Sequence, residues 1–171
     1  MKYLSEQIGD YIYQLTYDHL PPEVVQQAKL VTLDAIGDSF SSCDTLWAQA
    51  LYKNIQNQAG KNEASILVFG DTVPDVNAAF VNAMFIQSMD FNDELSGIHT
   101  GSIIPATALS SAETTGSTGK ELIVSLVAGY DVAGRLADAI DAQSLFEQGY
   151  QPSGVLGSFM ASAVSSKLKY L

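Results

Sequence analysis

Titratable and polar side chains gather in one short stretch of the sequence, residues 88–109. Three carboxylates, one amide and one of the two histidines fall within ten residues: Asp90, Asp93, Glu94, Asn92 and His99. One apolar run precedes this stretch and another follows Pro105, so the polar groups are expected between two helices. Polar groups at helix ends can line a cleft without interrupting the core. The stretch is therefore the first candidate for a functional site.

General acid–base chemistry is the first use that these residue types suggest. If the preceding helix continued past Asp90, then Asp90, Asp93 and Glu94 would lie on one face, at spacings of three and four. Ionised carboxylates so close repel one another, which raises the pKa of at least one of them towards the range of a general base. The same carboxylates favour the imidazolium form of His99, which can donate a proton or bind an anion. A solvated helix end without a function explains the same residues equally well.

Metal binding fits this stretch less well. Asp90 and Asn92 match the first ligands of a calcium loop, but the sixth position, which needs glycine, is Leu95, and the twelfth, which needs glutamate, is Gly101. Zinc is disfavoured because His99 has no cysteine or histidine near it in the sequence. We expect no metal ligands here, with a weak site for a divalent cation as the open alternative. The sequence also contains no phosphate-binding loop, nucleophile elbow or dinucleotide fingerprint.

The composition disfavours several classes of function. A net charge of −11 with only eight lysines plus arginines disfavours nucleic acids and anionic membrane surfaces as partners. No apolar run approaches the ~18–20 residues of a membrane span, and the N-terminus lacks the apolar core of a signal peptide. The single cysteine, Cys43, favours the reducing cytoplasm. Because 47% of the residues are hydrophobic and 16% charged, we expect a partner or a further part of the protein to cover apolar surface.

The pattern of apolar residues predicts one all-α domain over residues 1–171, a bundle of about six to eight helices. Helices are expected over 3–16, 23–41, 45–58, 75–89, from 105, over 118–140 and from 155 to the C-terminus. Asp44 is expected to cap the third helix, and Thr118 and Glu121 match a capping box. The only strand-like run is 64–69, and 141–154 is expected to be a loop.

Three further expectations concern helix faces. The helix over 23–41 is predicted to be central because it has little polar surface near its middle. The helix over 75–89 is expected to present one apolar face: Val76, Ala79, Phe80, Ala83 and Met84. Arg135, the only arginine, is expected to form an ion pair on a helix surface.

Three segments resemble the N-terminal part of the MmgE/PrpD family, which includes 2-methylcitrate dehydratase, cis-aconitate decarboxylase and iminodisuccinate epimerase. They are LPPEVVQQAKLVTLDAIGDSF at 20–40, MDFNDELSGIHTGSIIPATAL and its continuation at 89–136, and GYQPSGVLGSFMASAVSSKL at 149–168. The resemblance implies a large all-α domain, a smaller lid domain, an active site between them and a homodimer. It implies no iron–sulfur cluster and no organic cofactor. The chemistry implied is removal of a proton next to a carboxylate, with loss of water or CO2, or inversion at carbon.

The resemblance also assigns roles to residues. Asp90 matches the first aspartate of the family's D-F-D-D signature and His99 the histidine of its H-P-[SG] signature, so both are implied as catalytic. The expected substrate-binding residues are Asn92, Asp93, Glu94, Ser102 and Gln151. Three positions depart from the family pattern: Asn92 replaces an aspartate, Thr100 a proline and Gln151 a histidine.

The chain stops at Leu171, and the family's lid domain and catalytic lysines have no counterpart in it. Each uncompensated like-charge contact at ~4 Å costs about 4 kcal/mol at an effective dielectric of ~20, so a polycarboxylate needs cations that this chain lacks. One hypothesis is a lyase-type domain for small di- or tricarboxylates that works with a second chain supplying the lid. The other is a catalytically inactive module for oligomerisation or regulation, derived from the same family.

Overall fold

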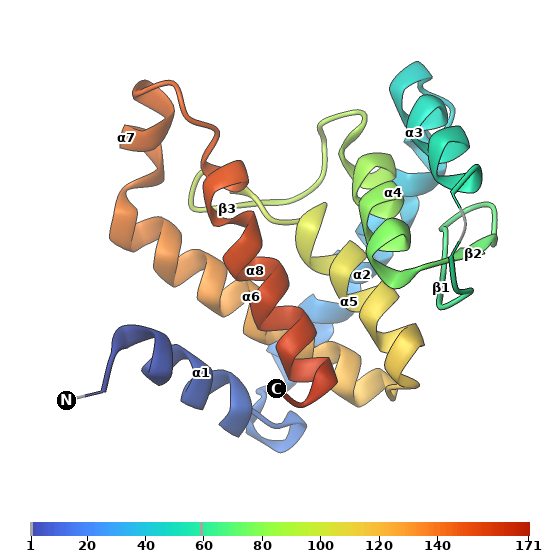
Figure 1. Ribbon diagram of the computed structural model, residues 1–171. Helices are drawn as coiled ribbons and strands as arrows, with labels where there is room; N and C mark the ends of the chain where they lie inside the picture. The colour runs from blue at the N-terminus through green and yellow to red at the C-terminus, as the bar shows by residue number, and fades with distance from the viewer. Residues whose placement is uncertain (1, 59) are drawn as a thin grey trace.

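The computed structural model describes residues 2–58 and 60–171, and helices dominate this part of the chain (Figure 1). Eight α-helices are found in the described residues: α1 (Leu4–Gln14), α2 (Pro22–Ser42), α3 (Leu46–Gln56), α4 (Asp75–Gln87), α5 (Ile103–Thr115), α6 (Gly119–Ile140), α7 (Ala142–Glu147) and α8 (Pro152–Lys169). A 3-10 turn, η1 (Tyr17–His19), joins α1 to α2. Two short antiparallel pairs complete the elements: β1 (Ala64–Ser65) with β2 (Thr72–Val73), and β3 (Glu94–Leu95) with β4 (Ile98–His99). The prediction of an all-α domain is confirmed.

Small residues bring α5, α6 and α8 close together in the main core. A Cβ atom at Gly129 of α6 would lie 2.6 Å from Val164 of α8 and 3.1 Å from Ile104 of α5. Leu126, Met160 and Val164 are among the buried residues that fill the space around this contact. Glycine therefore permits an approach that a larger side chain would prevent.

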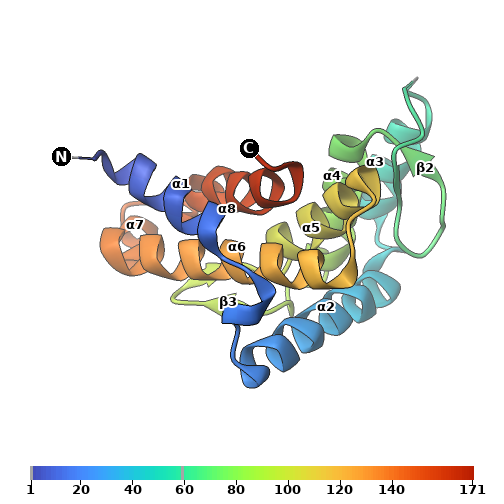
Figure 2. The same cartoon turned by 90° about the horizontal axis from the view of Figure 1, so that it is seen from below.

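A second core cluster lies between α3, α4 and the β1–β2 pair. Phe85 of α4 and Ile66 are fully buried in it, and Tyr52 of α3 stacks on Phe69 at 4.6 Å between ring centres. Ala35, Ile86 and Ala106 are packed together and join α2, α4 and α5. The two clusters meet along the contact between α4 and α5, which lie side by side (Figures 1 and 2).

Two expectations about helix faces are wrong. Helix α2 is not central, because its Leu30 and Leu33 side chains are 47% and 66% exposed. Helix α4 buries a different face from the one predicted: Ala78, Val81, Asn82, Phe85 and Ile86 are buried, whereas Val76 and Phe80 are exposed. Both helices are apolar on most sides, so the spacing of their apolar residues does not single out the buried face.

Several element boundaries also differ from the predictions. Helix α4 ends at Gln87, and α5 begins at Ile103, so Pro105 lies in its first turn, where the missing N–H is not needed. The strand-like run at 64–69 contributes only the two residues of β1. The expected loop at 141–154 contains α7, whose first turn is capped by the Asp141 carboxylate accepting a hydrogen bond from Ser144 N at 3.4 Å.

The two predicted caps have different outcomes. Asp44 does not cap α3, whose N-cap is Thr45 without a side-chain hydrogen bond. The capping box of α6 is confirmed, because Thr118 N donates to Glu121 Oε2 at 2.7 Å and Glu121 N donates to Thr118 Oγ1 at 3.3 Å.

Across residues 2–58 and 60–171, no helix has both the length and the apolar character that crossing a membrane would require.

Candidate functional site

The polar stretch between α4 and α5 folds into a hairpin instead of continuing α4. Asp90 has a φ of 57°, in the left-handed region, which ends the helical path of the chain. Glu94 then pairs with His99 across β3 and β4. The turn between the strands holds Ser96 at φ 50° and Gly97 at φ 77°, as two-residue hairpin turns require. The helical face expected for the three carboxylates therefore does not exist.

The hairpin returns His99 to the neighbourhood of Asp90. The His99 Nε2 and Asp90 Oδ1 atoms are 3.8 Å apart, and Gln87 Nε2 donates a hydrogen bond of 2.6 Å to the same oxygen. The side chain of Asp90 is 71% exposed and that of His99 is 27% exposed. In the described part of the chain, the buried Nδ1 atom of His99 has no hydrogen-bond partner. A half-buried imidazole beside an exposed carboxylate can accept or donate a proton to a bound ligand.

The start of α8 lies beside the Asp90–His99 pair. The backbone N–H of His99 donates to Ser153 Oγ at 2.8 Å, which fixes β4 against the first turn of α8 (Figure 1). Gln151 is the N-cap residue of α8 and is exposed. The N-terminus of a long helix attracts negative charge, since its first N–H groups have no partner within the helix. Asp90, His99 and Gln151 thus lie on neighbouring elements: the end of α4, β4 and the start of α8.

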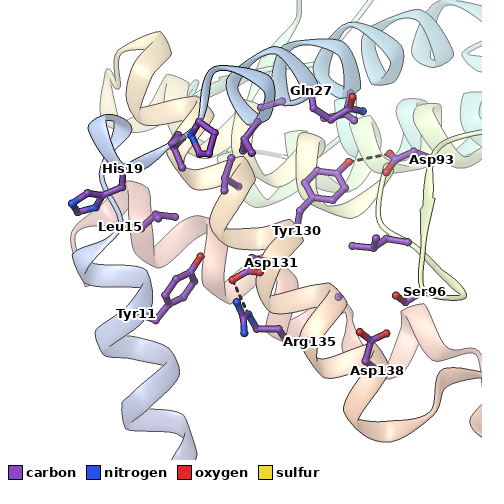
Figure 3. Close-up of a pocket in the computed structure, with 18 of the residues that line it drawn as sticks. Tyr11, Leu15, His19, Gln27, Asp93, Ser96, Tyr130, Asp131, Arg135 and Asp138 are labelled. Atoms are coloured by element: carbon purple, nitrogen blue, oxygen red, sulfur yellow. Dashed lines mark hydrogen bonds and ion pairs between the residues drawn. The ribbon is translucent and has the colours of Figure 1, made fainter.

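Asp93 faces the opposite way, towards α6 (Figure 3). Its Oδ1 accepts a hydrogen bond from the Tyr130 hydroxyl at 3.0 Å, and its Oδ2 accepts one from Thr100 Oγ1 at 3.0 Å. A Cβ atom at Gly101 would collide with this carboxylate and lie 2.9 Å from Asp93 N. Asp93 therefore anchors both strands of the hairpin to α6, and Thr100, where the family has proline, supplies one of its two donors.

The pKa of Asp93 is raised, as expected for one carboxyl of the stretch, but the expected cause is wrong. Burial is the largest cause, and the hydrogen bonds from Tyr130 and Thr100 partly oppose it. The charge that adds to the rise is that of Asp34 on α2, not that of Asp90 or Glu94.

The two remaining predicted residues are buried in the hairpin and at the start of α5. Asn92 donates from Nδ2 to Asp93 O at 3.4 Å, and its Oδ1 is a buried acceptor without a partner in the described residues. Ser102 immediately precedes α5 and is also buried. Their burial leaves little surface for a ligand unless the hairpin moves.

A cavity of about 800 Å³ lies on the other side of the hairpin, between α1, α2 and α6 (Figure 3). Asp93 and Glu94 line it, but Asp90, His99 and Gln151 do not. The predicted site residues are therefore divided between the two sides of the hairpin.

Arg135, the only arginine that lines this cavity, is already paired, whereas Glu94 and Asp138 in the same lining have no ion pair in the described residues. Arg135 Nε donates to Asp131 Oδ2 at 2.8 Å, which confirms the predicted ion pair, and the guanidinium lies 5.9 Å from the centre of the Tyr11 ring. Burial, followed by the contact with Asp131, raises the pKa of Tyr11 to about 12. The arginine is already compensated, so the cavity is poorly suited to an anionic ligand.

Tyr130 is the site residue that the sequence does not reveal. It lies in a long apolar helix, 37 residues from Asp93. A buried tyrosine in such a helix indicates that its hydroxyl needs a partner, but not which one.

The fold and the site together define an all-α domain with a carboxylate–histidine pair where the end of α4, the start of α8 and the β3–β4 hairpin meet. The chain belongs to the MmgE/PrpD family, since the profile of the MmgE/PrpD N-terminal domain matches residues 6–171. It is similar to the cis-aconitate decarboxylase-like protein oryM of Aspergillus oryzae, with 25% identity over 96% of this chain and 36% of that protein. It is also similar to the cis-aconitate decarboxylases of Homo sapiens, with 28% identity over 98% of this chain and 36% of that protein, and of Aspergillus terreus, with 22% identity over 96% and 35%. The chain thus spans about a third of the length of these curated relatives.

Proposed function

We propose that this chain supplies one wall of a lyase site for small di- or tricarboxylates, of the kind that decarboxylates cis-aconitate or dehydrates 2-methylcitrate. The observation that carries the proposal is the Asp90–His99 pair, held at 3.8 Å between the end of α4, β4 and the start of α8. Membership of the MmgE/PrpD family and relatives named cis-aconitate decarboxylases support this substrate class.

The residues of this wall have distinct roles in the proposal. His99 binds a substrate carboxylate or donates a proton, either to the carbon that has lost CO2 or to the leaving hydroxyl group. Asp90 is the base that removes the proton next to a substrate carboxylate, or it orients the substrate. Gln151, at the N-cap of α8, can donate a hydrogen bond to a carboxylate but cannot transfer a proton, because an amide does not titrate near neutral pH.

Cations from outside residues 1–171 are part of the proposal. A tricarboxylate brings up to three negative charges to a chain whose net charge is −11, and Arg135 is already paired with Asp131. Without cations, each close like-charge contact costs about 4 kcal/mol at an effective dielectric of ~20. Residues 1–171 alone are therefore expected to bind such acids weakly, and turnover requires the lid to be present, whether from the same protein or from a second chain.

Turnover measurements with the lid-bearing polypeptide present test the proposal. We expect CO2 release from cis-aconitate, or dehydration of 2-methylcitrate, and a fall in kcat of about 10²–10⁴ for Asp90→Asn or His99→Gln. Asp10→Asn on α1, a matched exposed aspartate, should change nothing. Absence of turnover for both acids would refute the catalytic proposal, and full activity of Asp90→Asn would refute the role of Asp90.

The second candidate is a catalytically inactive helical module that acts in oligomerisation or regulation. The glutamine at position 151, in place of the family's histidine, favours it because one proton-transferring group is absent. Such a module should show no turnover with the lid present and should self-associate in sedimentation velocity experiments. A monomer that turns over either acid would rule it out.

A further inference from the structure

The outer face of α2 carries an exposed apolar stripe with the spacing of a helix-packing surface. Leu30, Leu33, Gly37 and Phe40 follow one another at intervals of three, four and three, and the Phe40 side chain is 63% exposed. A Cβ atom at Gly37 would have no neighbour within 4 Å, so another backbone can approach closely there. Figure 2 shows α2 at the edge of the molecule, with no helix beyond it.

A hollow of about 560 Å³ runs beside the stripe and is acidic at one end. Asp34 and Asp38 of α2 and Asp93 of the hairpin line it, together with Leu30 and Leu33. Asp38 is only 5% exposed, and its Oδ2 is buried without a hydrogen-bond partner in the described residues. None of the ion pairs found in residues 2–58 and 60–171 includes any of the three carboxylates.

A buried carboxyl without a partner needs a physical explanation, because nearly all buried polar atoms in native proteins are paired. Burial, then the charges of Asp34 and Asp93, raises the pKa of Asp38 to about 6. At neutral pH the group is therefore mostly ionised, with one oxygen buried and no cation paired with it in the described residues. A cationic side chain between the three carboxylates would compensate this charge.

We propose that this face of α2 docks a basic amphipathic helix that lies outside residues 1–171, which packs apolar residues on Leu30, Leu33 and Phe40 and places a lysine or arginine between Asp34, Asp38 and Asp93. The exposed stripe would form the apolar contact with this helix, and the open space at Gly37 would let the two backbones approach closely. The unpaired Asp38 carboxyl favours a cationic side chain at that point. The inference does not depend on the chemistry proposed for Asp90 and His99.

A second copy of this chain does not fit the same face. A two-fold contact would bring Asp34 and Asp38 towards their own copies, in chains that each carry a net charge of −11. Like charges facing one another across an interface oppose association. The occupant is therefore a basic amphipathic helix.

A designed peptide pair tests the surface. The probe is a 16-residue alanine-based helix with leucines at positions 4, 7 and 14 and an arginine at position 11, and its control has glutamine at position 11. Binding to the full chain is followed by fluorescence anisotropy of the labelled peptide and by amide chemical shifts. We expect the arginine peptide to bind about tenfold more tightly than the glutamine peptide, with shifts confined to α2 and the hairpin.

Variants of the full chain test whether the carboxylates of the hollow cause the preference for the arginine peptide. Asp38→Asn should remove the tenfold preference for arginine and leave binding of the glutamine peptide unchanged, whereas Asp10→Asn should alter neither. If Asp38→Asn does not fold, Asp34→Asn, at an exposed position, should reduce the preference about threefold. Equal binding of the two peptides, or a preference that survives these substitutions, would overturn the proposal. Concentration-dependent shifts of α2 without peptide would also overturn it, because they would make a second copy the occupant.

Discussion

At the scale of the residue, the buried carboxyl of Asp38 makes stability depend on pH. Its pKa in the folded protein is about 6, against an ordinary value of 3.8, so the folded state holds this proton more tightly than the unfolded state. The stability it contributes is fully present below pH ~4, is lost as pH rises to ~6, and stays lost above, on the order of 1–3 kcal/mol in all.

Replacement of Asp38 by asparagine isolates this contribution. We expect Asp38→Asn to be more stable than the wild type at pH 7.5 by about 1–2 kcal/mol, and no more stable at pH 4, in urea unfolding followed by circular dichroism. The exposed Asp10→Asn variant is the control for the loss of one negative charge. A difference between Asp38→Asn and the wild type that is the same at both pH values would contradict this explanation.

The hydrogen bond from the Tyr130 hydroxyl to Asp93 makes a second contribution to stability that can be measured. Its donation to Asp93 Oδ1 lowers the pKa of a carboxyl that burial raises. We expect Tyr130→Phe to cost about 1–3 kcal/mol of unfolding free energy, because a buried acceptor loses its donor. Tyr13→Phe, at an exposed position of α1, is the matched control and should cost less than about 0.5 kcal/mol. Equal losses in the two variants would show that the hydrogen bond contributes nothing.

At the scale of the element, the hairpin depends on the close approach of Gly101 to Asp93. An alanine there must displace Asp93 N, a backbone atom that would lie 2.9 Å from the new Cβ. We expect Gly101→Ala to destabilise the protein by about 1–3 kcal/mol and to broaden the His99 imidazole signals in NMR spectra. Gly9→Ala in α1, where a Cβ meets nothing within 4 Å, should instead stabilise it by about 0.5 kcal/mol. A Gly101→Ala protein as stable as the wild type would show that the hairpin adapts.

The sequence predicts the helices well because their information is local. Apolar spacing locates α1 to α6 and α8, and the capping box of α6 is visible in four consecutive residues. The hairpin cannot be predicted in this way, since β3 and β4 have two residues each and begin after a non-glycine residue, Asp90, at positive φ. The direction in which Asp93 points is set by Tyr130, whose position beside the hairpin depends on the packing of the whole bundle. The sequence therefore predicts that polar site residues gather between α4 and α5. It does not predict that the hairpin divides them between its two sides.

At the scale of the whole molecule, the net charge of −11 opposes compaction. Carboxylates outnumber cationic side chains by 19 to 8, and in the described residues four of the cations already form ion pairs: Lys2, Lys61, Arg135 and Lys169. Repulsion among the remaining carboxylates is lost when the chain unfolds and expands, so screening it should favour the folded state.

We therefore expect the thermal midpoint to rise by several degrees between 10 and 300 mM NaCl. Over this range the Debye length falls from ~30 Å to less than ~8 Å, so most of the gain should be complete by 300 mM, and KCl should act like NaCl. Differential scanning calorimetry at pH 7.5, where Asp38 is ionised, measures the effect, and the Asp38→Asn variant should show a smaller rise because one buried charge is gone. A midpoint that is independent of salt, or that rises only in proportion to salt beyond 300 mM, would mean that the acidic surface is already compensated locally and that self-repulsion does not limit the stability of this fold.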